Sequence, residues 1–206
     1  MSTDCRFALL TNGSVFSQRV VECLLLKRFP PALVALPEYA PADVEACGAF
    51  NIQPPSPQRK IIALLPDVPF VYAPESSLRV LIESLQQFAI EFILVACWPY
   101  LLDTSIYQCA DRPALNLHPS LLPDFRGPDP LNQQISSQQT KFGVTLHMLN
   151  GKFDQGDIIA QSTFKIPQTE LNLVRLQQDC ALLGVELFVE AINKYKGEGW
   201  QPIPQG

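Results

Sequence analysis

Short apolar runs recur along the chain and predict a series of β-strands. They occupy residues 6–11, 32–36, 61–65, 70–72, 92–97, 114–118, 143–148 and 158–165. The run at 92–97 is almost continuously apolar, which is typical of a strand buried between two layers of helices. We therefore expect this strand to lie in the middle of a sheet.

Between these runs, apolar residues recur every three or four positions, which predicts helices. The predicted helices cover residues 15–29, 76–90, 127–136 and 170–195. Ser14 is a suitable N-cap for the first helix, and Pro128 suits the first turn of the third. Residues 37–60 are rich in proline and predict a loop, in which a short helix at 41–47 could form.

This alternation of strands and helices predicts an α/β fold: a Rossmann-like, mostly parallel twisted sheet flanked by helices. With 206 residues the chain can form one domain that buries about 70% of its unfolded surface. We expect a single domain over residues 1–206, with no separate C-terminal domain. No G-x-G-x-x-G follows the first strand, so a nicotinamide dinucleotide site is not predicted.

Composition narrows the class of protein. The net charge is −5 and no long Lys/Arg cluster occurs, which disfavours a large nucleic acid partner. The N-terminus does not resemble a signal peptide, and no apolar stretch is long enough to span a membrane, so we expect a cytoplasmic protein. The six cysteines show no C-x-x-C spacing, which predicts free thiols and no metal site.

Two polar residues lie at the end of the predicted strand at 114–118. Asn116 and His118 point to the same face because side chains alternate along a strand, and Pro119 ends the strand directly after them. This places them at a crevice at the carboxyl edge of the sheet, where α/β proteins bind ligands. Taken by itself, a strand-end histidine such as His118 is more often a hydrogen-bonded structural residue than a catalyst. We also interpret His147 as structural.

Two longer segments carry a resemblance to a known family. LNLHPSLLPDFRGPDP at residues 115–130 and GVTLHMLNGKFDQGDIIAQ at residues 143–161 resemble the folate-dependent formyltransferases. The two motifs occur in the family's order and at a compatible separation. The resemblance implies an enzyme of one-carbon metabolism that moves a formyl group from 10-formyltetrahydrofolate to a primary amine, without a metal. It also implies that Asn116, His118 and Asp154 are catalytic.

Formyl transfer requires an unprotonated nucleophile, stabilisation of the tetrahedral oxyanion and a proton for the departing nitrogen. Each of these side chains can contribute to the reaction. The Asn116 amide can donate to the oxygen on which negative charge develops. His118 can shuttle a proton or, as imidazolium, stabilise that charge, and Asp154 can orient its ring and favour the charged form. The sequence does not indicate the protonation state of His118.

The resemblance also implies contacts to the folate. They would come from Trp98, Tyr100, Leu102, Asn150, Phe153 and Asp154. On this view Trp98 forms a wall of the pterin pocket, and Tyr100 and Leu102 offer main-chain groups. Trp98 and Tyr100 could equally be ordinary half-buried aromatics, and Pro99 removes one amide donor.

For the acceptor, the turn formed by Asn12, Gly13 and Ser14 could bind a phosphate or carboxylate at a helix N-terminus, or it could simply cap the helix. Ser120 and Arg126 are further candidates for acceptor contacts. Arg126 could bind an anionic group of the acceptor or form a surface pair with a neighbouring aspartate.

We expect the acceptor to be a small-molecule amine, such as a nucleotide, a sugar amine or an amino-acid derivative, and we do not expect tRNA. Three alternatives stay open: formylation of methionyl-tRNA, hydrolysis of formyltetrahydrofolate, and folate binding without turnover. The sequence leaves homodimer formation open.

Overall fold

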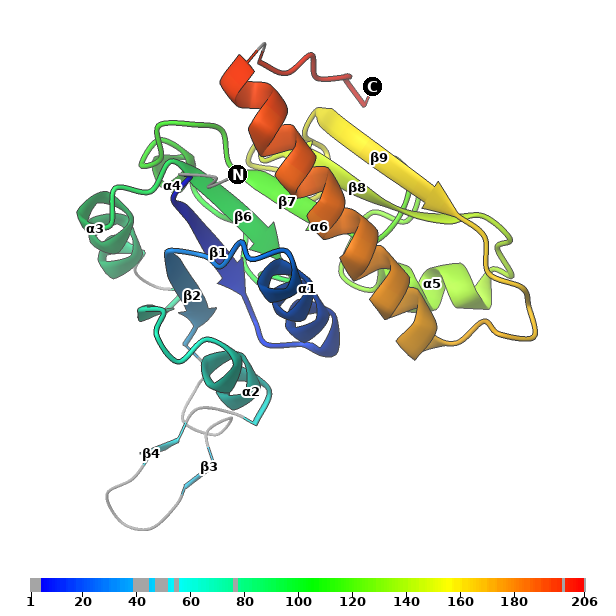
Figure 1. Cartoon of the computed structure of the whole chain (residues 1–206), viewed down its shortest axis with the longest axis horizontal. Coiled ribbons are helices and arrows are strands. Elements are labelled where there is room, and N and C mark those ends of the chain that lie inside the picture. The colour runs from blue at the N-terminus through cyan, green and yellow to red at the C-terminus, as the bar shows by residue number, and fades with distance from the viewer. Residues whose placement is uncertain are drawn as a thin grey trace.

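A seven-stranded sheet runs through the middle of the molecule (Figure 1). The computed structural model describes residues 5–38, 45–46, 52–53, 56–75, 78–197 and 199–205. The strands of the sheet are β1 (Phe7–Thr11), β2 (Leu33–Pro37), β5 (Phe70–Ala73), β6 (Phe92–Ala96), β7 (Leu115–His118), β8 (Phe142–Met148) and β9 (Ile158–Phe164). A separate pair consists of β3 (Glu45–Ala46) and β4 (Ile52–Gln53).

The order of the strands in the sheet is β5-β2-β1-β6-β7-β8-β9. The first five strands in this order pair in parallel, whereas β8 pairs antiparallel with β7 and β9 pairs antiparallel with β8. The mostly parallel α/β sheet predicted from the sequence is thus confirmed. The apolar run at 92–97 forms β6, which lies fourth of the seven strands and is buried throughout, as predicted.

The helices are α1 (Val15–Leu26), α2 (Ser56–Leu64), α3 (Arg79–Gln87), α4 (Thr104–Tyr107), α5 (Pro130–Ser136) and α6 (Leu173–Gly197). Ser14 caps α1 as predicted, because its side chain accepts a hydrogen bond from the backbone N–H of Ser17. Helix α5 begins at Pro130, two residues after the predicted Pro128. Within the described residues, no helix is both long and apolar enough to cross a membrane.

The strand predicted at residues 61–65 is wrong, because most of this run belongs to α2. Burial there repeats at Ile61 and Leu65, four residues apart, while the residue midway between them is exposed, which is the spacing of a helix face. A short apolar run cannot be assigned to strand or helix by its pattern alone. The short helix predicted at 41–47 falls mostly outside the described residues, and the two residues described there form β3.

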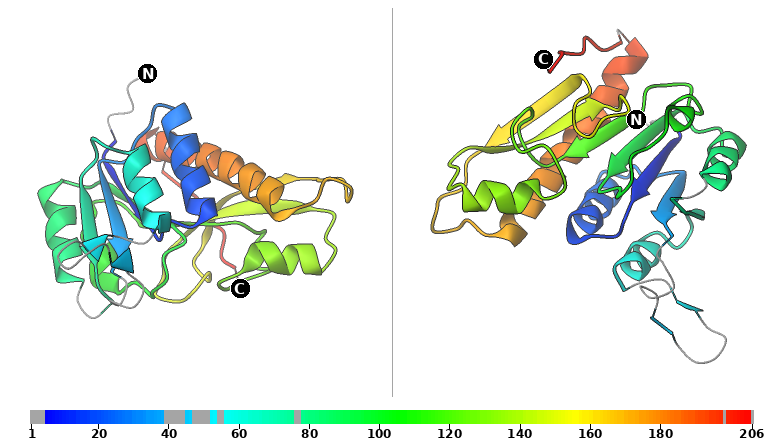
Figure 2. Two further views of the ribbon diagram at one scale, coloured as in Figure 1. Left: turned by 90° about the horizontal axis from the view of Figure 1, so that it is seen from below. Right: turned by 180° about the vertical axis from the view of Figure 1, so that it is seen from behind.

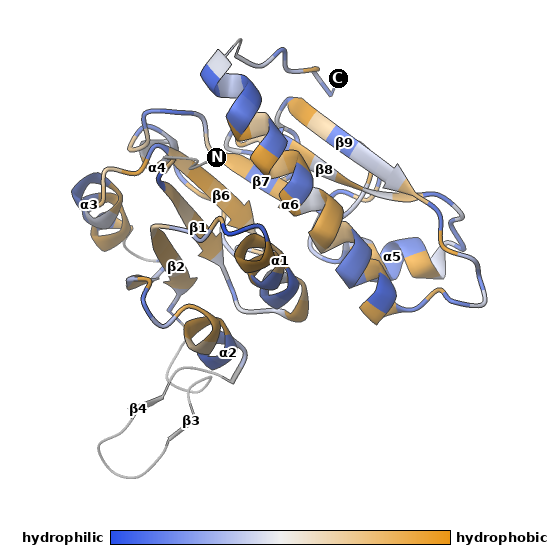
Figure 3. Cartoon of the chain, viewed as in Figure 1, coloured by the Kyte–Doolittle hydropathy of each residue, from blue (hydrophilic) through white to orange (hydrophobic). Residues whose placement is uncertain are grey.

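Helices cover both faces of the sheet (Figure 2). One apolar core joins β7 and β8 to α1 and α6, and a second joins β2 and β6 to α3 and α4. Figure 3 shows apolar residues gathered on the strands and on the inner sides of the helices. The sheet is therefore the middle of three layers.

Helix α6 approaches β7 closely. A Cβ added to Gly184 would lie 2.7 Å from both methyl groups of Leu117, a fully buried residue of β7. Leu115 and Leu117 belong to the core shared with α6. Asn116 and His118 alternate with them along the strand and so face the other side.

Candidate active site

Polar side chains of β7 and β8 share one face of the sheet. In the antiparallel pairing of these strands, Asn116 lies opposite His147 and His118 lies opposite Thr145. Directly opposed residues of neighbouring strands project to the same side. The polar face of β7 therefore continues onto β8, while the leucines of both strands pack on α6.

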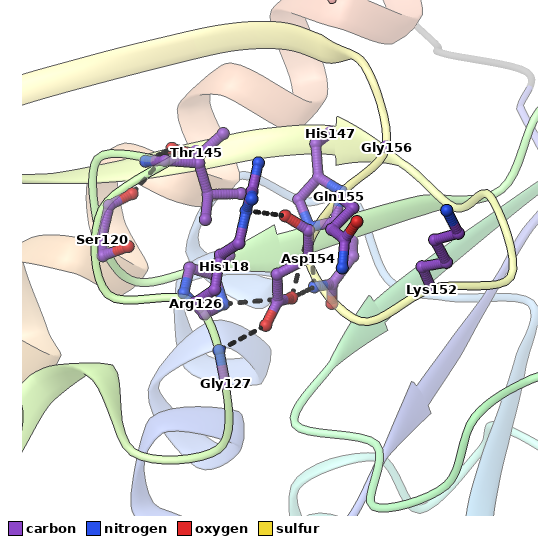
Figure 4. A network of polar contacts seen from close by, with 12 residues as sticks. His118, Ser120, Arg126, Gly127, Thr145, His147, Lys152, Asp154, Gln155 and Gly156 are labelled. Atoms are coloured by element: carbon purple, nitrogen blue, oxygen red, sulfur yellow. Dashed lines mark hydrogen bonds and ion pairs between the residues drawn. The ribbon is translucent and has the colours of Figure 1, made fainter. Parts of the chain in front are cut away.

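The loop between β8 and β9 brings Asp154 to this face (Figure 4). One carboxylate oxygen, Oδ1, lies 3.3 Å from Nδ1 of His118 and 3.1 Å from Nδ2 of Asn116. The other, Oδ2, accepts a hydrogen bond of 2.9 Å from the backbone N–H of Gly127. The three residues predicted to be catalytic thus meet at one point, although they lie up to 38 residues apart in the sequence.

Gly156 lets this loop pass close to β8. A Cβ on Gly156 would lie 1.7 Å from the carbonyl oxygen of Met148, so no other residue fits without moving the backbone. Asp154 itself has a φ of 53°, in the left-handed region where aspartate is better tolerated than most residues. Local geometry therefore explains why an aspartate at 154 and a glycine at 156 suit this D-x-G segment.

The surroundings of Asp154 favour its charged form. Asp154 is buried, with 8% of its surface exposed. Burial alone would raise the pKa of Asp154, but the hydrogen bond and charge of His118, the nearby ring of His147 and the N–H of Gly127 hold it well below its usual range. The site therefore holds a carboxylate, rather than a carboxylic acid, against the His118 ring.

Both nitrogens of His118 face hydrogen-bond acceptors. Nδ1 lies beside Asp154, and Nε2 lies 2.9 Å from the carbonyl oxygen of Phe125. A carbonyl and a carboxylate can only accept, so a ring that bonds to both must carry a proton on each nitrogen. The arrangement suits an imidazolium that holds a proton and a positive charge at the site.

His147, interpreted from the sequence as a structural residue, contacts this site from β8 without lining the cavity described below. Its Nδ1 donates to the carbonyl oxygen of Met148 at 2.9 Å, so in the neutral ring Nε2 accepts. Nε2 lies 3.0 Å from Nδ2 of Asn116. The two amide hydrogens of Asn116 are thus directed at Asp154 and His147. The alternation of Thr145 and His147 along β8 was the available signal, but it needed the pairing with β7.

A cavity of about 650 Å³ opens in front of these residues. It lies at the carboxyl ends of β1, β6 and β7, where ligands bind in open α/β sheets. Of the residues predicted to bind or react with ligands, those that line it are Asn12, Ser14, Trp98, Tyr100, Leu102, Asn116, His118, Phe153 and Asp154. Phe153 is 56% exposed and lies in the loop that carries Asp154.

Four of the predicted contact residues lie outside the lining. Ser120 is fully buried and its hydroxyl donates to the carbonyl oxygen of Asp124. The Asn150 side chain bonds to the backbone of its own loop, at Lys152 and Gln155. These two side chains hold loops in place rather than face the cavity.

Gly13 and Arg126 also have other positions than expected. Gly13 has a φ of 83°, and a Cβ there would lie 2.8 Å from the backbone of Pro57, so this glycine permits α2 to pack against the turn. Nε of Arg126 donates to the carbonyl oxygen of Asp154 at 3.1 Å, and its Nη2 donates to Gln205 at 2.8 Å. Neither of the two roles expected for Arg126 matches this arrangement.

The geometry can be compared with known proteins. A family model described as formyl transferase matches residues 52–192, more than half of the chain. The chain belongs to the formyl transferase family. The resemblance seen at residues 115–130 and 143–161 is confirmed at the level of the family.

Individual relatives agree with this formyl transferase assignment. A methionyl-tRNA formyltransferase of Staphylococcus aureus (strain Newman) is 31% identical over 191 residues, covering 92% of this chain and 58% of that relative. Our chain thus spans less than two thirds of the relative's length.

Two solved structures share the formyl transferase fold. Phosphoribosylglycinamide formyltransferase from Bacillus halodurans has a TM-score of 0.67 at 19% identity, covering 94% of this chain and 96% of that chain. HypX from Aquifex aeolicus, in complex with tetrahydrofolic acid, has a TM-score of 0.62 at 17% identity, covering 98% of this chain and 28% of that chain. At these identities the likeness concerns the fold alone.

Proposed function

We propose that this protein is an N-formyltransferase that moves a formyl group from 10-formyltetrahydrofolate to a primary amine. The observation that carries the proposal is the convergence of Asn116, His118 and Asp154 on one wall of the cavity. Membership of the formyl transferase family supports the same reaction class.

The cavity suits a folate as formyl donor. Its volume is in the range of pockets that bind drug-sized ligands, about 300–1,000 Å³. Trp98, Tyr100 and Leu102 line one part of it, and Phe153 lies at the loop in front. Nε1 of Trp98 is a buried donor with no acceptor among the described residues. Apolar walls with an unused donor fit a flat heteroaromatic ring that carries acceptors.

His118 would supply the proton and the positive charge. Formyl transfer requires stabilisation of negative charge on the formyl oxygen and a proton for the departing nitrogen. The imidazolium can give its Nε2 proton to the departing nitrogen by exchanging its bond to Phe125, and the neutral ring can then take up the proton that the attacking amine loses. Asp154 stays ionised and holds the ring through Nδ1, so the ring keeps its orientation during this exchange.

Asn116 would have two tasks. With both amide hydrogens engaged, it connects Asp154 to His147 and so helps to position the carboxylate. To donate to the formyl oxygen it must exchange one of these bonds, and the bond to His147 is the one whose loss leaves Asp154 in place. Hydrogen bonds of a catalytic site commonly rearrange in this way when the ligands bind.

For the acceptor we favour a small-molecule amine that carries few phosphates. Among the described residues that line the cavity, Lys152 is the only lysine or arginine, whereas the same lining includes two carboxylates, those of Asp129 and Asp154. The net charge of −5 also gives no general attraction to a polyanion. Methionyl-tRNA is the second candidate, because a relative with that activity in its name is 31% identical over most of this chain.

The test is to incubate the purified protein with 10-formyltetrahydrofolate and follow the release of tetrahydrofolate with a panel of amines and with methionyl-tRNA. Release that depends on an amine supports transfer and identifies the acceptor class. Release without any amine would point to hydrolysis instead. Binding of the folate without any release would contradict an enzymatic role.

Variants of the site make the test specific. His118→Gln keeps a hydrogen-bonding side chain but removes the proton and charge, and should lower kcat by about a hundredfold or more. Lys141→Ala, at an exposed position directly before β8, serves as the control and should retain full activity. An unchanged rate in His118→Gln would exclude the proposed role of His118.

A further inference from the structure

The side chain of Asp154 is well held, but its backbone adopts a conformation that is unfavourable for a residue with a side chain. A left-handed φ costs about 1 kcal/mol or more for such residues. The φ of 53° therefore requires support from the surrounding structure. The contacts of the carboxylate supply part of this support, and contacts to the backbone of the turn supply a further part.

Two side chains hold the backbone of this turn. Nε of Arg126 donates to the carbonyl oxygen of Asp154, and the amide nitrogen of Gln205 donates to the carbonyl oxygen of Gly156. The two are joined to each other, since Nη2 of Arg126 donates to Oε1 of Gln205 at 2.8 Å. Figure 4 shows Arg126 beside the turn that contains Asp154 and Gly156. Arg126, Gln205 and the turn at 154–156 thus form a closed ring, called here the turn clamp.

Gln205 is brought to the turn by the segment that follows α6. Trp200 anchors the start of this segment, because its Nε1 donates to the carbonyl oxygen of Ala191 at 2.8 Å and its ring packs against Tyr195. Ile203 then pairs with Ile158 of β9 through two backbone hydrogen bonds of 2.8 and 2.9 Å. Gln205 follows two residues later, so the sheet itself fixes its position.

We propose that Gln205 is a positioning residue for catalysis. It does not line the cavity. It acts through Arg126 and the turn, and fixes the place of Asp154 relative to His118. This proposal rests on the proposed formyltransferase activity, since it assigns to Gln205 an effect on the same reaction. A displacement of about 1 Å at a catalytic group can cost a hundredfold in rate, so a partly loosened turn should give a smaller but measurable loss.

Gln205→Ala is the principal variant, and Gln205→Glu separates the two halves of the clamp. Glutamate keeps an acceptor for Arg126 but has no N–H for Gly156. Gln201→Ala is the matched control, because Gln201 is an exposed glutamine of the same segment. The rate of tetrahydrofolate release is measured with the accepted amine, and amide hydrogen exchange is measured over residues 150–157 without any ligand.

We expect Gln205→Ala to lower kcat by about tenfold while KM for the folate changes by less than about twofold. Exchange over residues 150–157 should become faster, and Gln201→Ala should change neither quantity. Gln205→Glu should show an intermediate loss. If Gln205 acts through Arg126, adding Gln205→Ala to Arg126→Ala should cause little further loss.

Other outcomes would overturn the proposal in distinct ways. Unchanged exchange in Gln205→Ala would show that Gln205 does not hold the turn. Faster exchange with an unchanged kcat would show a structural contact without a role in positioning. If the wild-type protein released no tetrahydrofolate, the proposed function would fail, and the exchange measurement would still decide whether the turn clamp exists.

Discussion

Asn116 and His147 face each other across two antiparallel strands, with 3.0 Å between the amide nitrogen of one and Nε2 of the other. This contact joins a second histidine, which does not line the cavity, to Asn116, which does. It fixes the plane of the Asn116 amide, because His147 Nδ1 is itself fixed by the carbonyl oxygen of Met148. The orientation of Asn116 is therefore set by His147 as well as by its bond to Asp154.

The first prediction concerns this contact. His147→Leu removes the acceptor for the Asn116 amide and should lower kcat by about tenfold, whereas His147→Gln offers an oxygen near the place of Nε2 and should retain more activity. Steady-state kinetics of both variants check this. Equal losses in both would show that the ring fills space and does not orient Asn116.

A second prediction concerns Gly156. Gly156→Ala would place a methyl group against the carbonyl oxygen of Met148, so the loop must move and carry Asp154 away from His118. We expect kcat to fall by about a hundredfold and the free energy of unfolding to fall by about 1–3 kcal/mol. Gly197→Ala is the control, because a Cβ at that position meets nothing within 4 Å. Full activity in Gly156→Ala would contradict the close approach.

A third prediction follows from the low pKa of Asp154. A carboxylate whose pKa is lower in the folded state stabilises the protein above the unfolded pKa, near 3.9, and loses this effect as the pH falls below it. Wild type should therefore exceed Asp154→Asn in free energy of unfolding by about 1–3 kcal/mol at neutral pH. The difference should shrink below about pH 4.

Urea denaturation of both proteins between about pH 3 and pH 7 measures this difference. Asparagine is the appropriate replacement, because it tolerates the left-handed backbone of Asp154 and so changes mainly the charge. A difference that stayed constant down to the lowest pH would show that Asp154 is not stabilised as a carboxylate.

A fourth prediction concerns Trp98. Its buried Nε1 has no acceptor among the described residues, so Trp98→Phe removes no hydrogen bond that they provide, and any loss of stability comes from the packing lost with the smaller ring. If the folate accepts from this nitrogen, KM for the folate should rise by about fivefold, the equivalent of one neutral hydrogen bond. Thermal unfolding and KM measurements separate the two effects. An unchanged KM would place the folate ring elsewhere in the cavity.

Much of the fold could be predicted because local patterns determine it. The continuous run of β6 and the alternation of β7 each indicate how a strand is buried, and Ser14 marks the start of α1. The run at 61–65 was assigned wrongly because five apolar residues suit a strand and a helix face equally well. Its true periodicity appears only when burial is known.

Some residues of the candidate site could likewise be predicted from the sequence, and others could not. Asn116 and His118 could be placed on one face from their spacing, and the family resemblance supplied Asp154. The contacts of His147, Arg126 and Gln205 depend on which strands and loops become neighbours, and 79 residues separate Arg126 from Gln205. Spacing along a sequence holds no information on such a pairing.

The tight packing of Gly184 against Leu117 has a consequence for how this protein could change its acceptor. With no free space behind β7, the strand cannot retreat to admit a bulkier molecule, so Asn116 and His118 on this strand keep fixed positions. New specificity, in nature or by design, has to come from the segments in front of it, at residues 127–131 and 149–153. These are the segments to randomise in a search for altered acceptors.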